Sequence, residues 1–150
     1  MLNNIMTEGE CSKLRSLIHH ANNIVLCCHV SPDGDAIGSV LGMAEVLKCM
    51  GKEPVMVVPD QFPDYLQWLP NTEKIVRYDK RSDYVDMVLK IADLVICLDF
   101  NALSRTDDME AALEACTAPR VLIDHHLNPS IACQVCVSHP NMSSASELVF

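Results

Sequence analysis

Hydrophobic residues follow two alternating patterns along the chain. Short and nearly uninterrupted apolar runs, such as Ile24–Val30, are typical of strands that are buried on both faces. Between these runs, apolar residues recur every three or four positions, as Leu14, Leu17 and Ile18 do, and this spacing predicts helices. The runs predict strands over residues 24–30, 53–59, 93–100, 120–126 and, at an edge of the sheet, 132–138. The spacing predicts helices over residues 8–21, 36–50, 82–92 and 107–116.

The order of these elements predicts the fold. Strands that alternate with helices are typical of an α/β domain with a mostly parallel sheet and helices on both faces. Gly38 and Gly42 lie one turn apart, which would let the second helix approach the sheet closely. Ser144 and Glu147 fit a capping box, so a further helix is expected to begin at residue 145 and to be cut off at Phe150. We therefore expect residues 1–150 to be one domain, the truncated N-terminal part of a longer protein.

Composition and charge indicate which kinds of molecule the protein does not bind. The chain carries 11 Lys and Arg residues against 20 Asp and Glu residues, a net charge of −9. An acidic surface repels long nucleic acid, so binding of a phosphorylated substrate would need a local positive charge, for example from a metal ion. No apolar run approaches the ~20 residues that span a bilayer, and the polar N-terminus does not resemble a signal peptide. We therefore expect a cytoplasmic protein that binds neither long nucleic acid nor a membrane.

Eight cysteines could indicate disulfides or a metal site. Cys27, Cys28 and Cys97 lie inside apolar runs, where a thiol acts as a small buried hydrophobe, so we expect reduced cysteines. Cys133 and Cys136 have the spacing of a zinc knuckle. In an alternating strand, however, positions i and i+3 face opposite ways, and no second knuckle accompanies this pair. The sequence therefore argues against zinc there.

Acidic and imidazole side chains follow the predicted strands where these strands end. His29 ends the first strand and runs into Asp33 and Asp35, Asp99 ends another, and Asp124–His126 end a third. Ligands of open parallel sheets gather beyond the carboxyl ends of the strands, so these groups should converge at one edge. Carboxylates packed together repel each other and take up protons unless a cation is bound. Oxygen-rich ligands with one imidazole per ion suit Mn²⁺ or Mg²⁺, so the sequence predicts a divalent metal site.

Each of these segments also has an ordinary structural interpretation. Asp33 and Asp35 lie in a turn and could simply cap the next helix, and Asp99 could be a cap or an ion-pair partner. A pair of neighbouring histidines is usually without function, as we expect for His19 and His20 on the first helix. The metal site is favoured because three separated segments bring such groups to the same edge of the sheet.

Three motifs resemble those of a known family. HVSPDGDAIGS at residues 29–39, CLDFNA at residues 97–102 and IDHH at residues 123–126 resemble, in order and spacing, the first three motifs of the DHH phosphoesterase superfamily. The similarity extends from about Ile24 to Phe150, and the terminal stretch SHPNMSSASELVF favours the nanoRNase/pAp-phosphatase branch. The resemblance implies an N-terminal DHH domain here. It also implies that a fourth motif and a C-terminal DHHA1 domain, which would hold the nucleotide, lie outside this sequence.

The resemblance further implies a centre of two metal ions, usually manganese, with magnesium as the alternative. By motif matching, His29 and Asp33 would hold the first ion, Asp35 and His125 the second, and Asp99 would bridge both. Such a pair of ions lowers the pKa of a bridging water and binds the phosphate oxygens, so no protein nucleophile is needed.

Other residues receive roles from the same resemblance. Asp124 would orient a neighbouring ligand, and His126 would face the substrate phosphate and assist proton transfer, so both are candidate catalytic residues. Arg105 would touch a phosphate, although a solvated cation at the start of a helix explains this residue at least equally well. Ser39 would support the turn rather than attack the substrate.

The expected function is that of a metal-dependent phosphoesterase. Its substrates would be short oligoribonucleotides, hydrolysed to mononucleotides, and 3′-phosphoadenosine 5′-phosphate (pAp), hydrolysed to AMP. Within the same superfamily, the alternatives are a cyclic-dinucleotide phosphodiesterase and an inorganic pyrophosphatase. The alternatives of another class are a non-catalytic nucleotide-binding module and an inactive fragment, and a homodimer is left open.

Overall fold

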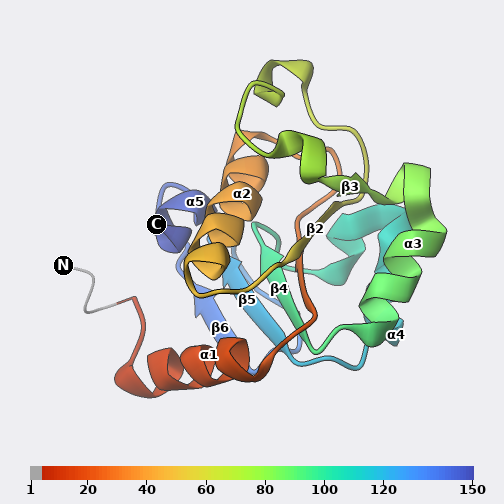
Figure 1. Cartoon of the computed structure of the whole chain (residues 1–150). Helices are drawn as coiled ribbons and strands as arrows, with labels where there is room; N and C mark the ends of the chain where they lie inside the picture. Colours follow the sequence, from red (N-terminus) through yellow and green to blue (C-terminus); the bar gives the residue numbers. More distant parts are fainter. Residues whose placement is uncertain (1–4) are drawn as a thin grey trace.

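The computed structural model of the chain describes residues 5–150 (Figure 1). Its strands are β1 (Ile24–Cys27), β2 (Val55–Val58), β3 (Val76–Arg77), β4 (Leu94–Leu98), β5 (Arg120–Asp124) and β6 (Val135–Ser138). Its α-helices are α1 (Glu8–His20), α2 (Gly34–Cys49), α3 (Tyr78–Ile91), α4 (Glu110–Ala115) and α5 (Ala145–Val149). The connections contain the 3₁₀ segments η2 (Asp64–Leu66), η3 (Thr72–Lys74) and η4 (Leu103–Met109).

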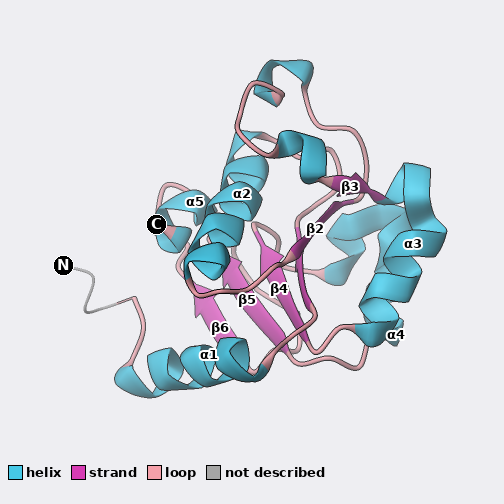
Figure 2. Cartoon of the chain, in the orientation of Figure 1, coloured by secondary structure: helices cyan, strands magenta, loops and turns pink. Residues whose placement is uncertain are grey.

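The strands form one parallel sheet in the order β3-β2-β1-β4-β5-β6. Successive residues of β1 face opposite sides: Ile24 and Leu26 join one apolar core, and Val25 and Cys27 join the other. Helices α1, α2 and α5 pack on the first face of the sheet, and α3 and α4 pack on the second (Figure 2). The predicted α/β fold, with a parallel sheet between two layers of helices, is confirmed.

The predicted strands exist, but the apolar runs are longer than the strands they contain. β1 ends at Cys27, three residues before the predicted end, and the chain bends at Val30 and Ser31, where Ser31 has a positive φ of 50°. β3 is only two residues long and has no hydrophobic pattern of its own, so the sequence did not predict it.

Two helices begin at other residues than expected. α3 starts at Tyr78 rather than at residue 82, with an irregular backbone at Arg81. The predicted helix over residues 107–116 is preceded and partly replaced by η4, so that α4 is a short helix. Among residues 5–150, no helix has both the length and the apolar character that crossing a bilayer requires.

The helix expected at residue 145 is present as α5, and it packs on α2. The Ser144 side chain caps it by accepting the Glu147 N–H at 3.1 Å. The expectation that Gly38 and Gly42 bring α2 close to the sheet is wrong, because both glycines face α5. A Cβ added at Gly42 would lie 3.5 Å from Val149 Cγ1. The missing side chains therefore allow a close approach of two helices rather than of a helix and the sheet.

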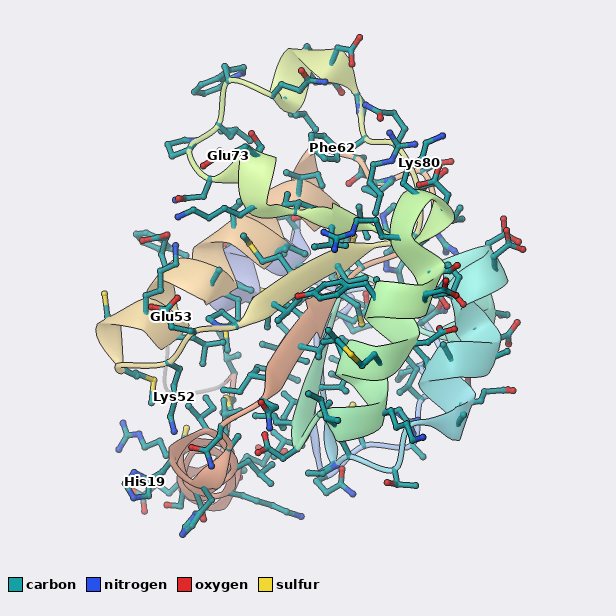
Figure 3. All side chains as sticks on the ribbon, turned by 45° about the vertical axis from the view of Figure 1, so that its right-hand side comes forward. His19, Lys52, Glu53, Phe62, Glu73 and Lys80 are labelled. Carbon is teal, nitrogen blue, oxygen red and sulfur yellow. The ribbon has the colours of Figure 1, made fainter. Side chains whose placement is uncertain are left out.

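The carboxyl-terminal end of α1 lies near the amino ends of β1 and β2 (Figure 3). There Lys52 Nζ donates to the carbonyl oxygens of His19 and Ala21, at 2.9 and 2.7 Å. His19 and His20 are exposed, and His20 Nδ1 lies 2.8 Å from the Ser16 carbonyl oxygen. These two histidines lie away from the carboxyl ends of the strands, and the expectation that they have no function stays a prediction.

The cysteines are free thiols, and Cys27, Cys28 and Cys97 are buried. The expectation that Cys133 and Cys136 face opposite ways is wrong. Cys133 precedes β6 and packs against the second core. Cys136 faces the same side, since Val135 and Val137 on either side of it join the first core. Burial and the neighbouring Cys136 raise the pKa of Cys133 to about 11, which disfavours the thiolate that a metal requires. Within residues 5–150, neither cysteine belongs to a cluster of three metal-ligating side chains.

Candidate metal centre

Three strand ends meet at the carboxyl edge of the sheet, as the parallel topology requires. His29 follows β1, Asp99 directly follows β4, and Asp124–His126 lead from β5 into the next loop. Because β4 lies between β1 and β5, Asp99 stands between the other two segments. Asp33 and Asp35 come from the start of α2, where the Asp33 carboxylate also accepts a backbone N–H of the first turn at 3.0 Å.

The two oxygens of Asp99 face different imidazoles. Asp99 Oδ2 lies 3.5 Å from His29 Nε2, whereas Asp99 Oδ1 lies 3.4 Å from His125 Nε2 and 3.8 Å from His126 Nδ1. Asp33 Oδ1 lies 3.9 Å from the same nitrogen of His29. Two groups of potential ligand atoms, each within 4.8 Å of one another, are formed by His29, Asp33 and Asp99 and by Asp99, His125 and His126. Asp99 belongs to both groups, as a carboxylate that bridges two ions would.

The surroundings of Asp99 disfavour a charged carboxylate that has no cation. Its side chain is 2% exposed, and within the described part of the chain Oδ1 has no hydrogen-bond partner. Burial raises the pKa of Asp99, the hydrogen bond from His29 opposes this, and the negative charges of Asp35 and Asp33 add to it. The backbone φ of +65° is a left-handed conformation that costs of order 1–3 kcal/mol. Strain and an unpartnered buried oxygen are typical of a functional residue, and a divalent cation would satisfy that oxygen.

Backbone carbonyls orient two of the imidazoles. His29 Nδ1 lies 2.7 Å from the Val30 carbonyl oxygen, and His125 Nδ1 lies 3.3 Å from the Met142 carbonyl oxygen. In both rings Nδ1 donates to the carbonyl oxygen, and Nε2, which faces Asp99, becomes the ligand atom once it has lost its own proton.

A carboxylate orients the third imidazole. His126 Nδ1 lies 2.7 Å from Oδ1 of Asp124, a fully buried residue whose Oδ2 has no partner within residues 5–150. Because Nδ1 donates to Asp124, Nε2 is the nitrogen available to a group from outside the chain. The His126 side chain is one-third exposed, at 34%, so such a group can reach it.

Asp35 lies beside the second group without belonging to it. Its Oδ2 lies 3.4 Å from His125 Nε2. Both oxygens also accept backbone N–H groups from the start of α5, Oδ2 from Ala145 and Oδ1 from Ser146, each at 2.8 Å. Burial raises the pKa of Asp35, but these hydrogen bonds and His125 outweigh burial, so the pKa is lowered. The residues that hold Asp35 lie more than a hundred positions away, and no sequence signal connected them with it.

Two further predicted residues lie at the border of this centre. The Arg105 carbonyl oxygen accepts the Val30 N–H at 2.7 Å, so η4 lies against the loop that carries His29. The Arg105 side chain is exposed, and its contact with a substrate phosphate stays a prediction. Ser39 is fully buried in α2, where its hydroxyl is closed to solvent and unpartnered among the described residues.

The affinity for metal should depend on pH through His29. Burial lowers the pKa of His29, but the hydrogen bonds to Asp99 and the Val30 carbonyl, with the charge of Asp33, outweigh burial and raise it. A raised pKa in the folded state means that protonated His29 stabilises the metal-free fold at low pH, and that this contribution is lost as pH rises through the folded-state pKa.

A metal ion that binds His29 must displace the proton from this imidazole. We expect the Mn²⁺ affinity to fall by up to about tenfold per unit between pH 8 and pH 6. Calorimetric titration measures this, and an affinity independent of pH would contradict it.

The sequence profile of the DHH family, N-terminal domain, matches residues 23–150. The chain belongs to the DHH family. A curated relative of this DHH domain is the bifunctional oligoribonuclease and PAP phosphatase NrnA of Thermus thermophilus, which is 33% identical over 129 residues. The match covers 84% of this chain and 35% of NrnA, so the chain spans about a third of that relative's length.

Solved structures share the fold of the DHH domain. An exopolyphosphatase-related protein from Bacteroides fragilis is 40% identical, with a TM-score of 0.95 over 99% of this chain and 44% of that protein. RecJ of T. thermophilus in complex with Mn²⁺ has a TM-score of 0.53 at 12% identity, over 95% of this chain and 19% of RecJ. The likeness to RecJ, at this identity, shows the fold alone.

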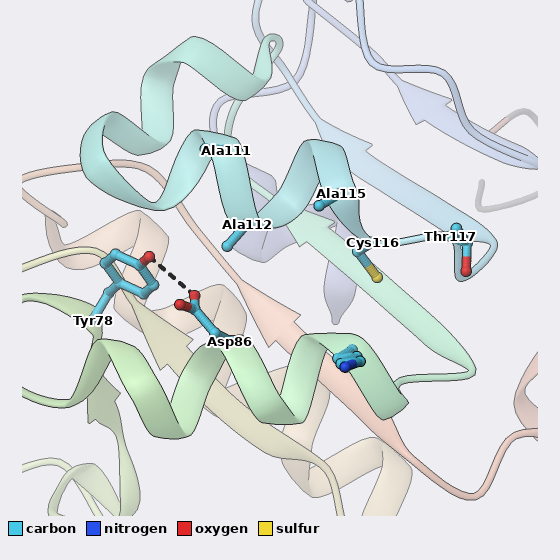
Figure 4. A pocket seen from close by; sticks show the side chains of 8 residues that line it. Tyr78, Asp86, Ala111, Ala112, Ala115, Cys116 and Thr117 are labelled. Atoms are coloured by element: carbon cyan, nitrogen blue, oxygen red, sulfur yellow. Dashed lines mark hydrogen bonds between the residues drawn. The ribbon is translucent and has the colours of Figure 1, made fainter.

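A groove between α3 and α4 lies apart from this centre in the DHH domain (Figure 4). It has a volume of about 590 Å³ and is lined by three alanines of the α4 segment, with Tyr78 Oη donating to Asp86 Oδ1 at 3.0 Å across from them. None of the predicted site residues lines it. The candidate functional site therefore remains the carboxyl edge of the sheet.

Proposed function

We propose that this DHH domain is the catalytic part of a phosphoesterase that hydrolyses short oligoribonucleotides to mononucleotides and pAp to AMP. The proposal rests on Asp99, whose two oxygens face two separate groups of potential ligand atoms. The similarity to NrnA, whose name gives both an oligoribonuclease and a PAP phosphatase activity, supplies the substrate class. Because the chain spans about a third of NrnA, the substrates of the whole protein belong to the proposal.

The donor set fits two Mn²⁺ or Mg²⁺ ions, which prefer carboxylate oxygens with few imidazoles. His29, Asp33 and Asp99 form the first group. We assign His125 and Asp35 to the second ion, since Nδ1 of His126 is already engaged by a carboxylate. When bound, the two ions lower the pKa of a water molecule and withdraw charge from the phosphate.

The remaining polar groups of the chain act on the substrate. Asp124 holds the His126 ring and would stabilise its imidazolium form, in which Nε2 can donate a hydrogen bond to a phosphate oxygen or give a proton to the leaving oxygen. The exposed Arg105, beside the His29 loop, would neutralise charge on a neighbouring phosphate. The net charge of −9 disfavours a long polyanion, which is consistent with a substrate of very few nucleotides.

Hydrolysis assays with the protein test this proposal. We expect release of AMP from pApA and from pAp in the presence of Mn²⁺ and none after chelation, because the carboxylate cluster needs the ions to act on a phosphate. Faster turnover of pyrophosphate or of a cyclic dinucleotide would identify one of the superfamily alternatives instead. Binding of Mn²⁺ and nucleotide without turnover of any of these would identify a binding module.

A further inference from the structure

The loop from His29 to Asp33 supplies two of the candidate ligands, yet it belongs to no regular element. Ser31 in the middle of this loop has a φ of 50°, in the left-handed region that residues other than glycine rarely adopt. Such a conformation persists only where neighbouring groups hold it. The loop therefore needs fixed contacts if its two side chains are to face Asp99 reproducibly.

A carboxylate outside both groups of ligand atoms provides one of these contacts. Asp60 follows β2, and its Oδ1 accepts the Ser31 N–H at 2.6 Å, while its Oδ2 lies 3.5 Å from Ser31 Oγ. On the other side of the loop, the Arg105 carbonyl oxygen accepts the Val30 N–H at 2.7 Å. The loops after β1 and β2 lie next to each other and line a hollow of about 350 Å³.

The bond to Asp60 acts on the same peptide unit that orients His29. The Ser31 N–H belongs to the peptide whose carbonyl oxygen is that of Val30, and this oxygen lies 2.7 Å from His29 Nδ1. Because a peptide unit is planar, fixing the direction of its N–H also fixes the direction of its C=O. A rotation of this peptide would turn the carbonyl away from Nδ1 and release the imidazole.

We propose that Asp60 is a positioning residue of the metal centre, which acts on His29 through the peptide between Val30 and Ser31. This inference rests on the proposed metal site, but it concerns a residue that is itself no ligand. Asp60 holds the peptide, the peptide holds Nδ1 of His29, and Nε2 is thereby directed toward Asp99. The sequence did not point to Asp60, because its partner is a backbone N–H, which leaves no pattern among side chains.

The test compares three variants of the protein. Asp60→Ala removes the acceptor, and Asp60→Asn keeps an oxygen for the Ser31 N–H. Asp64→Ala removes a nearby exposed carboxylate whose Oδ1 accepts the Gln67 amide at 2.9 Å. We expect Asp60→Ala to weaken Mn²⁺ binding by about 10- to 100-fold, the range found when groups that orient metal ligands are lost. Asp60→Asn should restore the affinity to within about threefold of wild type, since the hydrogen bond to the peptide is kept. Asp64→Ala should leave it unchanged. If Asp60→Ala does not fold, Asp60→Leu, which has similar bulk and no acceptor, replaces it.

A second readout needs no metal. In the metal-free protein, we expect Asp60→Ala to speed hydrogen exchange at the Ser31 amide and to change the tautomer of His29 seen in nitrogen NMR, whereas Asp60→Asn does neither. Wild-type exchange, tautomer and Mn²⁺ affinity in Asp60→Ala would overturn the inference. If the wild-type protein bound no Mn²⁺, the proposed function would fail, and these two NMR measurements would still decide whether Asp60 orients His29.

Discussion

An Asp99→Asn substitution is expected to lower Mn²⁺-dependent hydrolysis by at least about 10³-fold. The change removes a carboxylate that faces both groups of potential ligand atoms. Stabilisation of charge by metal ions contributes several kcal/mol to lowering a reaction barrier, and about 1.4 kcal/mol corresponds to a factor of ten. Asparagine has nearly the same shape and tolerates the φ of +65°, so the backbone should not move. The measurements are kcat/KM and a calorimetric titration with Mn²⁺.

The same variant should be at least as stable as the wild-type protein when no metal is present. Because burial raises the pKa of Asp99, the ionised carboxylate destabilises the fold at neutral pH, and a neutral amide relieves this. The matched control is Asp107→Asn, which changes an exposed aspartate that also has a positive φ, of 50°. An Asp99→Asn protein that unfolded would contradict the expected stability, and one that kept the full Mn²⁺-dependent rate would exclude Asp99 as the shared ligand.

A His126→Asn substitution is expected to lower kcat by about 10²- to 10⁴-fold, the usual contribution of a proton-transferring group. The asparagine amide can still donate to Asp124 from nearly the position of Nδ1, so the buried carboxylate keeps its partner. Only Nε2 is lost, and the melting temperature should stay close to that of the wild type.

Titration with Mn²⁺ separates this role from metal ligation. We expect the dissociation constant of the His126→Asn variant to change by less than about tenfold, which is within the effect of a residue that only neighbours the ions. His19→Asn, on the exposed end of α1, is the matched control for the exchange of residue type. Loss of a bound ion in His126→Asn would show that His126, rather than Asp35, belongs to the second ion.

The fold could be predicted largely because parallel strands buried on both faces leave uninterrupted apolar runs. The runs around β1, β4 and β5 also predict that His29, Asp99 and His125 meet at one edge of the sheet, where the structure has them. What the sequence could not show are contacts whose partners are backbone groups. The N–H groups of α5 that hold Asp35 and the Ser31 N–H that binds Asp60 have no signature in residue type.

Local patterns also failed where the chain departs from a regular element. The alternation that was expected to separate Cys133 from Cys136 does not apply, because β6 begins only at Val135. Spacing located Gly38 and Gly42 on one face of α2, but it could not tell whether that face meets the sheet or another helix.

The strand order has a consequence for how the domain assembles. The central strand β1 pairs with β4, so that Ile24 lies opposite Leu94, and β4 in turn pairs with β5. Pairings between such distant segments form slowly, since a long stretch of chain must close before any contact is made. His29, Asp99 and His125 follow these same three strands, so the complete set of ligands forms only when the strands have paired. Mn²⁺ at a hundred times its dissociation constant would stabilise the finished domain by about 2.7 kcal/mol. Bound metal would therefore stabilise the native state without speeding the folding reaction.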